Sequence, residues 1–372
     1  MEREALVTLM AWHRSARRLP LVVRGGRQVG KTWLVRELAR GSGRELMELN
    51  FEHSPRDDRF FASNEPQQIL AELSLAFDRT LDVSRSLLFL DEIQAAPGVL
   101  SKLRWFAELL PELPVVAAGS LLELALREPD LSMPVGRVSY QAVAPMSFPE
   151  FLRAHGQHKL LEHLEAWTPQ GTLAVSGHER ASRWFERFSM VGGMPGVVAA
   201  DVQGLEPHQI RRLQIDLVRT FRDDFAKYSR RADPRVLDAI LLAAVRMLGR
   251  KFVAARVGEG LKHHVVSSSL ELMSRAHLCH QVIHTAANGV PLGGETKPRL
   301  RKLLLLDVGL VHALVGTPAA QAFPTWADLG DQLRAQVVEQ VVGQQLHASS
   351  ADGDGSTRLY YWQREGGRAG EI

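Results

Sequence analysis

Cysteine is almost absent from this chain of 372 residues, because Cys279 is the only one. An intrachain disulfide is therefore impossible, and a metal site built on cysteines is not expected. Five histidines lie between His263 and His284, but their spacing does not match that of zinc ligands. The fold must depend on a buried core, and this length provides ample material for one in two or three domains.

Long hydrophobic runs are also missing. Apolar runs such as residues 303–306 have the length of core strands and not of membrane spans. A signal peptide is not expected at the N-terminus, because Arg14, Arg17 and Arg18 interrupt the apolar residues there. These absences predict a cytoplasmic protein that does not associate with a membrane.

The net charge is small, at +3, but its distribution is uneven. From Arg211 to Lys302 there are 18 lysines and arginines against 8 acidic residues, so this block carries +10 and the remainder −7. A basic block of this kind favours DNA as a partner, although such charges can also form only a solvated face.

The most specific motif is the phosphate-binding loop pattern GxxxxGK[ST], which residues 25–32 fit at every fixed position. A short apolar run typical of a buried strand precedes it, and residues 33–40 follow with helical spacing. Lys31 is expected to bind the β- and γ-phosphates of ATP, and the Thr32 hydroxyl to bind Mg²⁺. The predicted nucleotide-binding residues are Gly25, Gly26, Arg27, Gln28, Val29, Gly30, Lys31, Thr32 and Trp33.

Paired acids follow about 60 residues later, where the apolar run at residues 87–90 ends in Asp91 and Glu92. A buried parallel strand would place both carboxylates at the edge of the sheet where open α/β folds bind ligands. We expect Asp91 to bind Mg²⁺ and Glu92 to orient and deprotonate the attacking water. Ser120, after the next strand, is predicted to sense the γ-phosphate, to cap the helix that follows, or to do both.

These motifs together resemble a large prokaryotic family of AAA-superfamily ATPases. The resemblance is carried by residues 24–32, 88–94 and 118–120, then by 136–138, 144–152 and 192–195. It continues into the domain of unknown function that commonly follows this ATPase, so it covers the chain from about residue 17 to its last residue.

The resemblance implies an α/β fold in which a P-loop AAA-type parallel sheet carries a helical lid. A winged-helix segment and a partial endonuclease-like α/β domain would follow. We expect the ATPase core at residues 1–153, the lid and linker at 154–234, the basic winged-helix-like domain at 235–302 and the incomplete last domain at 303–372. The implied cofactors are ATP and Mg²⁺, and the implied assembly is a homo-oligomer. An arginine from a neighbouring subunit would complete the site, with Arg137 as first candidate and Arg127 as second; each can also be an ordinary surface arginine.

The basic block itself is predicted to form helices at residues 236–248, 252–257 and 262–276, followed by a β-ribbon that ends near residue 302. The third helix offers Lys262, His263 and His264, and a run of three serines at residues 267–269, to phosphates or base edges. Docking of a protein is the alternative use of such a module.

The last segment resembles the nuclease-like domains through Glu339 and Glu371, which would correspond to their metal-binding acids. Because the sequence stops at Ile372, the next acid and the lysine-bearing strand of that family have no counterpart. We therefore expect no nuclease activity.

The sequence predicts a Mg²⁺-dependent ATPase that couples nucleotide hydrolysis to DNA or partner binding through its basic segment. The alternative is a slow nucleotide-dependent switch that docks a protein partner in a regulatory or defence role. A small-molecule kinase is a third reading, which Glu92 disfavours because an activated water suits hydrolysis.

Overall fold

The computed structural model describes residues 1–120, 122, 134, 136–172, 174–228, 231–315, 326–349 and 358–363. Within these ranges the chain divides into two units. The N-terminal unit comprises residues 3–143, and the C-terminal unit comprises residues 1–2, 144–349 and 358–363. The positions of Arg127 and Glu371 lie outside the described residues.

The N-terminal unit is built on a five-stranded sheet in the order β2-β3-β4-β1-β5, and all neighbouring strands are parallel. The strands are β1 (Leu21–Arg24), β2 (Glu45–Asn50), β3 (Ser86–Asp91), β4 (Val115–Ala118) and β5 (Ser139–Ala142). The helices are α1 (Glu4–Arg14), α2 (Lys31–Ser42), α3 (Pro66–Ala76) and α4 (Pro97–Leu109). The predicted parallel α/β sheet is confirmed.

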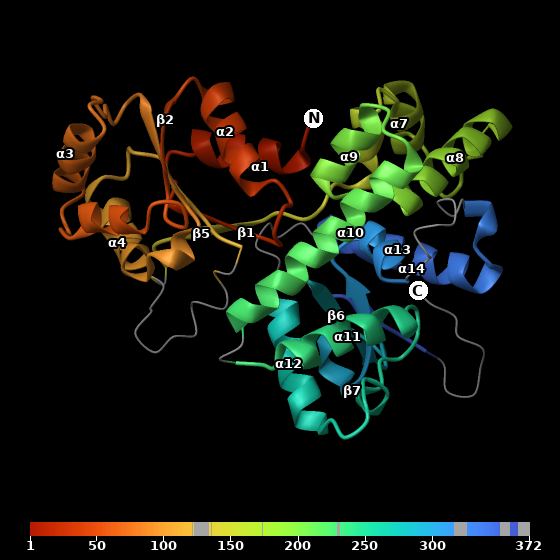
Figure 1. Ribbon diagram of the computed structural model, residues 1–372. Coiled ribbons are helices and arrows are strands. Elements are labelled where there is room, and N and C mark those ends of the chain that lie inside the picture. Colours follow the sequence, from red (N-terminus) through yellow and green to blue (C-terminus); the bar gives the residue numbers. More distant parts are fainter. Residues whose placement is uncertain are drawn as a thin grey trace. The chain divides into compact units, whose positions relative to one another are not determined.

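Helices cover both faces of this sheet, with α1 and α2 to one side of the strands and α3 and α4 to the other (Figure 1). Strand β3 is buried at every position, and its alternate residues Leu88 and Leu90 pack in one core with Ile69 of α3 and Leu103 of α4. Burial on both faces explains the continuous apolar runs in the sequence. The carboxyl ends of the parallel strands meet at one edge, where the residues after β1, β3 and β4 converge.

The C-terminal unit begins with a helical segment, whose first helix lies almost entirely inside the range expected for the ATPase core (1–153) and not in the range expected for the lid (154–234). Its helices are α6 (Phe148–Ala154), α7 (His158–Glu165), α8 (Val175–Val191), α9 (Pro195–Val202) and α10 (Pro207–Asp224). Helix α6 starts with a capping box, in which Ser147 and Glu150 each bind the other's backbone N–H. None of the described helices combines the length and the hydropathy that a bilayer-spanning segment requires.

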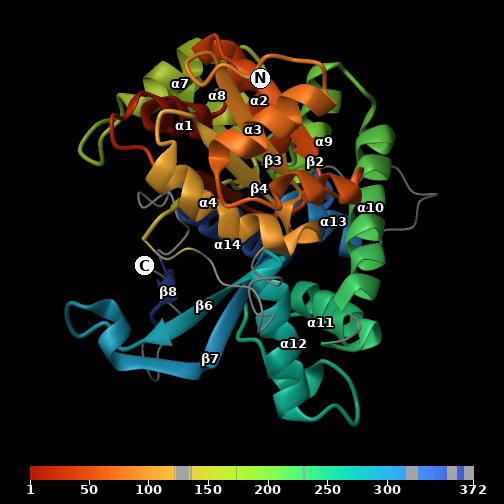
Figure 2. The same cartoon turned by 90° about the vertical axis from the view of Figure 1, so that its left-hand side faces the viewer.

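A small mixed sheet with helices completes this unit. Its elements are α11 (Pro234–Arg246), α12 (His263–Arg275), β6 (Cys279–Thr285), β7 (Thr296–Leu305), α13 (Val308–Val315), α14 (Asp331–Ala348) and β8 (Tyr360–Tyr361). The strand order is β7-β6-β8, with β6 antiparallel to β7 and parallel to β8. Figure 2 shows β6 and β7 as a twisted ribbon beside α11 and α12.

Two details of this region differ from the sequence-based expectation. Residues 252–257 were expected to be helical, but only a short 3₁₀ turn forms, at Ala254–Arg256. The segment is tied to β7 instead, because the Phe252 N–H donates to the Arg301 carbonyl at 2.7 Å. Strand β7 also continues to Leu305, so the boundary expected between residues 302 and 303 falls inside a strand.

A buried aspartate connects three segments of the C-terminal unit. Asp307 accepts hydrogen bonds from the Gly193 N–H (2.6 Å), the Gly309 N–H (2.9 Å) and the Gln344 side-chain amide (2.9 Å). Gly193 in turn accepts from the Met146 N–H at 2.7 Å, and a Cβ atom on Gly193 would overlap the Met146 carbonyl oxygen. Asp307 thereby holds the loop after α8 against the start of α13 and against the buried face of α14.

Candidate functional site

The glycine-rich loop after β1 has a backbone that only certain residues can adopt. Gly25 has φ +141° and Gly30 has φ +94°, and Gln28 also lies in the left-handed region at φ +62°. A Cβ atom on Gly25 would overlap the carbonyl oxygen of Val143, so the loop packs too closely there for any side chain. Gly30 immediately precedes α2, which places the loop at a helix N-terminus suited to bind phosphate.

Lys31 lies inside this loop and is only 6% exposed. Its ammonium group donates to the carbonyl oxygens of Gly25 (3.0 Å) and Gly26 (2.8 Å). Burial lowers the pKa of Lys31 to about 8, against the opposing effect of the negative charges of Glu92 and Asp91. A phosphate group would replace the loop carbonyls as a better partner for this desolvated cation.

Asp91, at the end of β3, is brought next to the loop. Its carboxylate accepts from the Thr32 hydroxyl (3.1 Å), from the Asn50 side-chain amide (3.2 Å) and from the Glu92 N–H (3.1 Å). The pKa of Asp91 is raised by burial first and by the charge of Glu92 second. A cation beside these carboxylates would relieve both effects.

The donor set fits Mg²⁺, which takes hard oxygen ligands and is usually held by one or two carboxylates together with substrate phosphates. Thr32 and Asp91 supply a hydroxyl and a carboxylate oxygen that already contact each other. Within the described ranges, no cluster of three or more His, Cys, Asp and Glu side chains could hold a metal ion, at this site or at any other.

Glu92 has a left-handed backbone conformation, with φ 49° and ψ 43°, which is unusual for a residue other than glycine. Its carboxylate accepts from the Ser120 hydroxyl at 3.3 Å and from the side-chain amide of Gln94. Gly119 makes room for Gln94, because a Cβ atom there would overlap the Gln94 amide oxygen. The carboxylate is thus positioned from two sides.

The comparison with known protein families matches residues 17–152 to an AAA domain. This part of the chain is an AAA domain. Residues 182–321 match a second family, described as a domain of unknown function (DUF8612). The two matches, in this order, confirm the resemblance that the sequence motifs carry.

Several solved structures are similar to this chain at low sequence identity. The chain covers 92% of the Aeropyrum pernix ORC1 protein, solved in complex with DNA, with 84% of its own length (16% identity, TM-score 0.30). The Aeropyrum pernix ORC2 protein is covered to 95% with 93% of this chain (12% identity, TM-score 0.35). For C. elegans PCH-2 the match covers half of that protein and 46% of this chain (14% identity, TM-score 0.28). No curated protein matches this sequence.

Two of the residues around the AAA site had no predicted role. Asn50 ends β2, the strand adjacent to β3, and reaches Asp91 only because the two strands pair in register at these positions. Gln94 belongs to the stretch that carries the family resemblance, but its contact with Glu92 depends on the turn after β3. The signal for Asn50 was a polar residue at the end of a half-buried strand, next in the sheet to the acidic pair.

Three of the predicted site residues take no part in the hydrogen bonds of Asp91 and Glu92 described above. Arg27 faces Glu52 at 3.9 Å, and Trp33 is 38% exposed. Arg137 is half exposed, and its guanidinium donates to Glu108 of α4 at 2.7 Å. Within the described residues, no hydrogen bond or ion pair joins Arg137 to the loop or to the paired acids.

The basic segment presents part of the predicted surface. Lys262, His263 and His264 are exposed at the start of α12, and Ser268 is exposed one turn later. Ser269 was expected to be able to reach DNA. This prediction is wrong, because the Ser269 side chain is buried, at 2% exposure, on the core face of the helix. On the ribbon, Lys297 and Arg299 are exposed.

Glu339, the predicted nuclease-type acid, is engaged in an ion pair. Its carboxylate accepts from the Lys302 ammonium at 3.0 Å, between α14 and β7. The second acid of that prediction, Glu371, lies outside the described residues.

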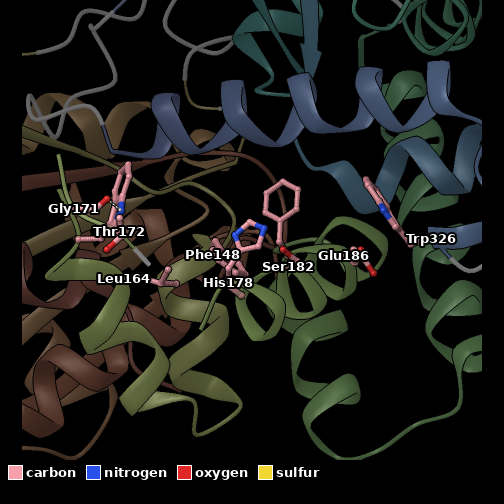
Figure 3. A pocket seen from close by; sticks show the side chains of 11 residues that line it. Phe148, Leu164, Gly171, Thr172, His178, Ser182, Glu186 and Trp326 are labelled. Atoms are coloured by element: carbon pink, nitrogen blue, oxygen red, sulfur yellow. Dashed lines mark hydrogen bonds between the residues drawn. The ribbon is translucent and has the colours of Figure 1, made fainter. Parts of the chain in front are cut away.

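An open groove of about 750 Å³ lies among the lid helices (Figure 3). Its apolar lining includes Phe148 of α6, Leu164 of α7, Phe185 of α8 and the indoles of Trp167 and Trp326. The remaining lining residues are Gly171, Thr172, His178, Ala181, Ser182 and Glu186. An apolar recess with few titratable groups suits the docking of another molecule better than catalysis.

Proposed function

We propose that this protein hydrolyses ATP with Mg²⁺ at the carboxyl edge of the parallel sheet. The observation that carries the proposal is the contact between Thr32 and Asp91 at 3.1 Å, with the carboxylate of Glu92 beside it on Ser120. Hydroxyl, metal-binding acid and candidate base therefore stand together next to a loop shaped for phosphates.

Each side chain has a separate role in the proposal. Lys31 binds the β- and γ-phosphates, and Thr32 and Asp91 hold Mg²⁺, which when bound would supply positive charge beside the phosphates. Glu92 takes a proton from the attacking water, and Ser120 reports the presence of the γ-phosphate through its contact with Glu92.

We propose that a second copy of the chain supplies a further positive charge to the phosphates. Arg137 is half exposed and pairs with an exposed acid, Glu108, so it can exchange that partner for a phosphate of a neighbouring subunit. In this scheme the protein works as a homo-oligomer, and turnover per chain rises with protein concentration.

The coupling partner in this proposal is DNA. The exposed residues at the start of α12 and the basic ribbon residues Lys297 and Arg299 form the contact surface. Residues 1–153 serve as the ATPase core, residues 154–234 as lid and linker, and the segment from residue 235 onward as the part that contacts DNA.

ATP turnover of the wild type and of Glu92→Gln, each with and without duplex and single-stranded DNA, tests this function. We expect Glu92→Gln to bind ATP with unchanged affinity and to lose turnover by at least about a hundredfold, because the candidate base is removed. Glu72→Gln, which neutralises an exposed acid on α3, is the matched control and should turn over ATP like the wild type. Unchanged turnover in Glu92→Gln would reject the assignment, and turnover indifferent to DNA would reject the coupling.

A second candidate function is a slow switch that retains its nucleotide and docks a protein. The apolar groove of Figure 3 favours it, because its lining combines the exposed indole of Trp167 with half-buried aromatic rings, and accessible apolar side chains are typical of docking surfaces. Tight nucleotide retention with negligible turnover in the same assay would favour this function over the first.

A further inference from the structure

A second recess in the C-terminal unit differs from the apolar groove in its chemistry. It is a groove of about 440 Å³ between the segment after α11, strand β7 and the chain around β8. We call it the basic groove; its lining residues are Gly249, Arg250, Lys251, Val253, Arg256, Lys302, Tyr361, Trp362 and Gln363. Four of them are cations, two are aromatic and none is acidic.

The floor of the basic groove is ordered by its own contacts. Lys302 is buried, and its ammonium group donates to Glu339 at 3.0 Å and lies 5.3 Å from the centre of the Tyr361 ring. The charge of Lys302 is therefore compensated inside the protein. Its contacts join β7, α14 and β8, which gives the groove a rigid base.

The rim carries charge that is not compensated. Arg250, Lys251 and Arg256 are exposed, and none of the three has an ion-pair partner among the described residues. Several acidic residues of the same basic block are paired elsewhere, as in Arg222–Asp238 at 2.6 Å and Arg275–Glu271 at 2.7 Å. The excess of positive charge predicted for this block is thus concentrated in part at the groove.

The combination of free cations and an accessible indole selects a ligand class. Arginine and lysine bind phosphates, and the half-buried ring of Trp362 offers a face on which a base can stack. A volume of about 440 Å³ lies in the usual range for small-molecule sites, so the groove accommodates a single unstacked nucleotide. An acidic peptide would use the cations but would leave the aromatic side chain without a matching partner.

We propose that the basic groove binds a single-stranded segment of nucleic acid, with phosphates on Arg250, Lys251 and Arg256 and a base against Trp362. The inference goes beyond the proposed function, in which α12 and the ribbon contact DNA. The two can fail separately, because strand binding is measured without ATP, and the loss of turnover in Glu92→Gln is also measured without nucleic acid.

Fluorescence anisotropy of a dye-labelled oligothymidylate of about a dozen nucleotides, titrated with the whole protein, tests the groove. The double variant Arg250→Ala/Arg256→Ala should bind at least about tenfold more weakly at low salt. The slope of log affinity against log salt concentration should also be smaller in magnitude than that of the wild type by about 1.4, because two phosphate contacts are lost. Trp362→Ala should weaken binding about tenfold with an unchanged salt slope, and Trp362→Phe should restore most of the affinity.

The matched control is Arg212→Ala/Arg219→Ala on α10, which removes two exposed arginines that pair with Asp216. It changes the net charge equally and should alter the affinity less than about twofold. Wild-type affinity in the groove variant, or an equal loss in the control, would overturn the proposal. A duplex that binds as tightly and depends equally on the groove would also overturn it, as would competition by poly-aspartate at equal charge.

Discussion

The pH dependence of nucleotide affinity follows from the environment of Lys31. In the nucleotide-free loop, burial brings the pKa of this ammonium group from 10.5 to about 8. Phosphates stabilise the charged form, so binding of a nucleotide raises the pKa and takes up a proton whenever the free protein has lost it. Affinity should therefore be constant below about pH 7.5 and fall above pH 8.

The size of the effect can be worked out from the pKa. If only protonated Lys31 binds the phosphates, about nine tenths of it is competent at pH 7 and about one tenth at pH 9. The dissociation constant for ADP should accordingly rise about tenfold between these values. The free energy of unfolding should change in the opposite direction, rising with pH. The pKa of Lys31 is lower in the folded than in the unfolded state, so the unfolded state binds more protons between about pH 8 and 10.5. The free energy of unfolding therefore rises across that window.

Titration calorimetry with ADP at pH 7, 8 and 9, in pairs of buffers with different ionisation heats, measures both the affinity and the proton uptake. The matched variant is Lys31→Arg, whose guanidinium stays protonated over this range, so its weaker binding should not change with pH. A wild-type dissociation constant that is equal at pH 7 and pH 9, or the same fall in the arginine variant, would refute this account of Lys31.

Two further substitutions test the contacts described above. Gln94→Ala removes a hydrogen bond to the Glu92 carboxylate, which is worth about 1.5–3 kcal/mol. The kcat for ATP should therefore fall about ten- to a hundredfold at unchanged nucleotide affinity. An unaltered kcat would show that Gln94 does not position Glu92. Gly193→Ala forces a Cβ atom onto the Met146 backbone and should reduce the free energy of unfolding by about 2–3 kcal/mol. In the control Gly196→Ala, the new Cβ atom meets no atom within 4 Å, so stability should not change. Equal urea midpoints for the two variants would contradict the close packing of Gly193.

The parts of the site that sequence patterns predicted are those in which neighbours in the chain do the chemistry. The loop at residues 25–32 must combine glycines, a lysine and a hydroxyl within one turn, and this combination is rare enough to identify from spacing alone. The acids Asp91 and Glu92 follow an apolar strand that can only be buried. Their meeting with Thr32 across the sheet edge then follows from parallel topology.

What sequence patterns missed depends on contacts between distant segments. The segment at residues 252–257 has apolar residues at helical spacing, but the hydrogen bond from Phe252 to β7 keeps its start extended. The side of α12 on which Ser269 lies was not evident from three serines in a row, because all three look polar until the helix is packed. The pairing of β8 with β6 joins segments far apart in the sequence, and no local pattern indicates which strand is the partner.

The hydrogen bonds of Asp307 have a consequence for how this chain can be divided. They join the loop after α8 to segments that begin 114 residues later, so neither part is complete alone. Without residues from β7 onward, the Gly193 N–H would lose its buried acceptor, and without that loop the buried Asp307 carboxylate would lose one of its three hydrogen bonds. The lid helices and the segment from β7 onward are therefore not interchangeable cassettes. Any exchange of one between related chains, by recombination or by engineering, must carry the other with it.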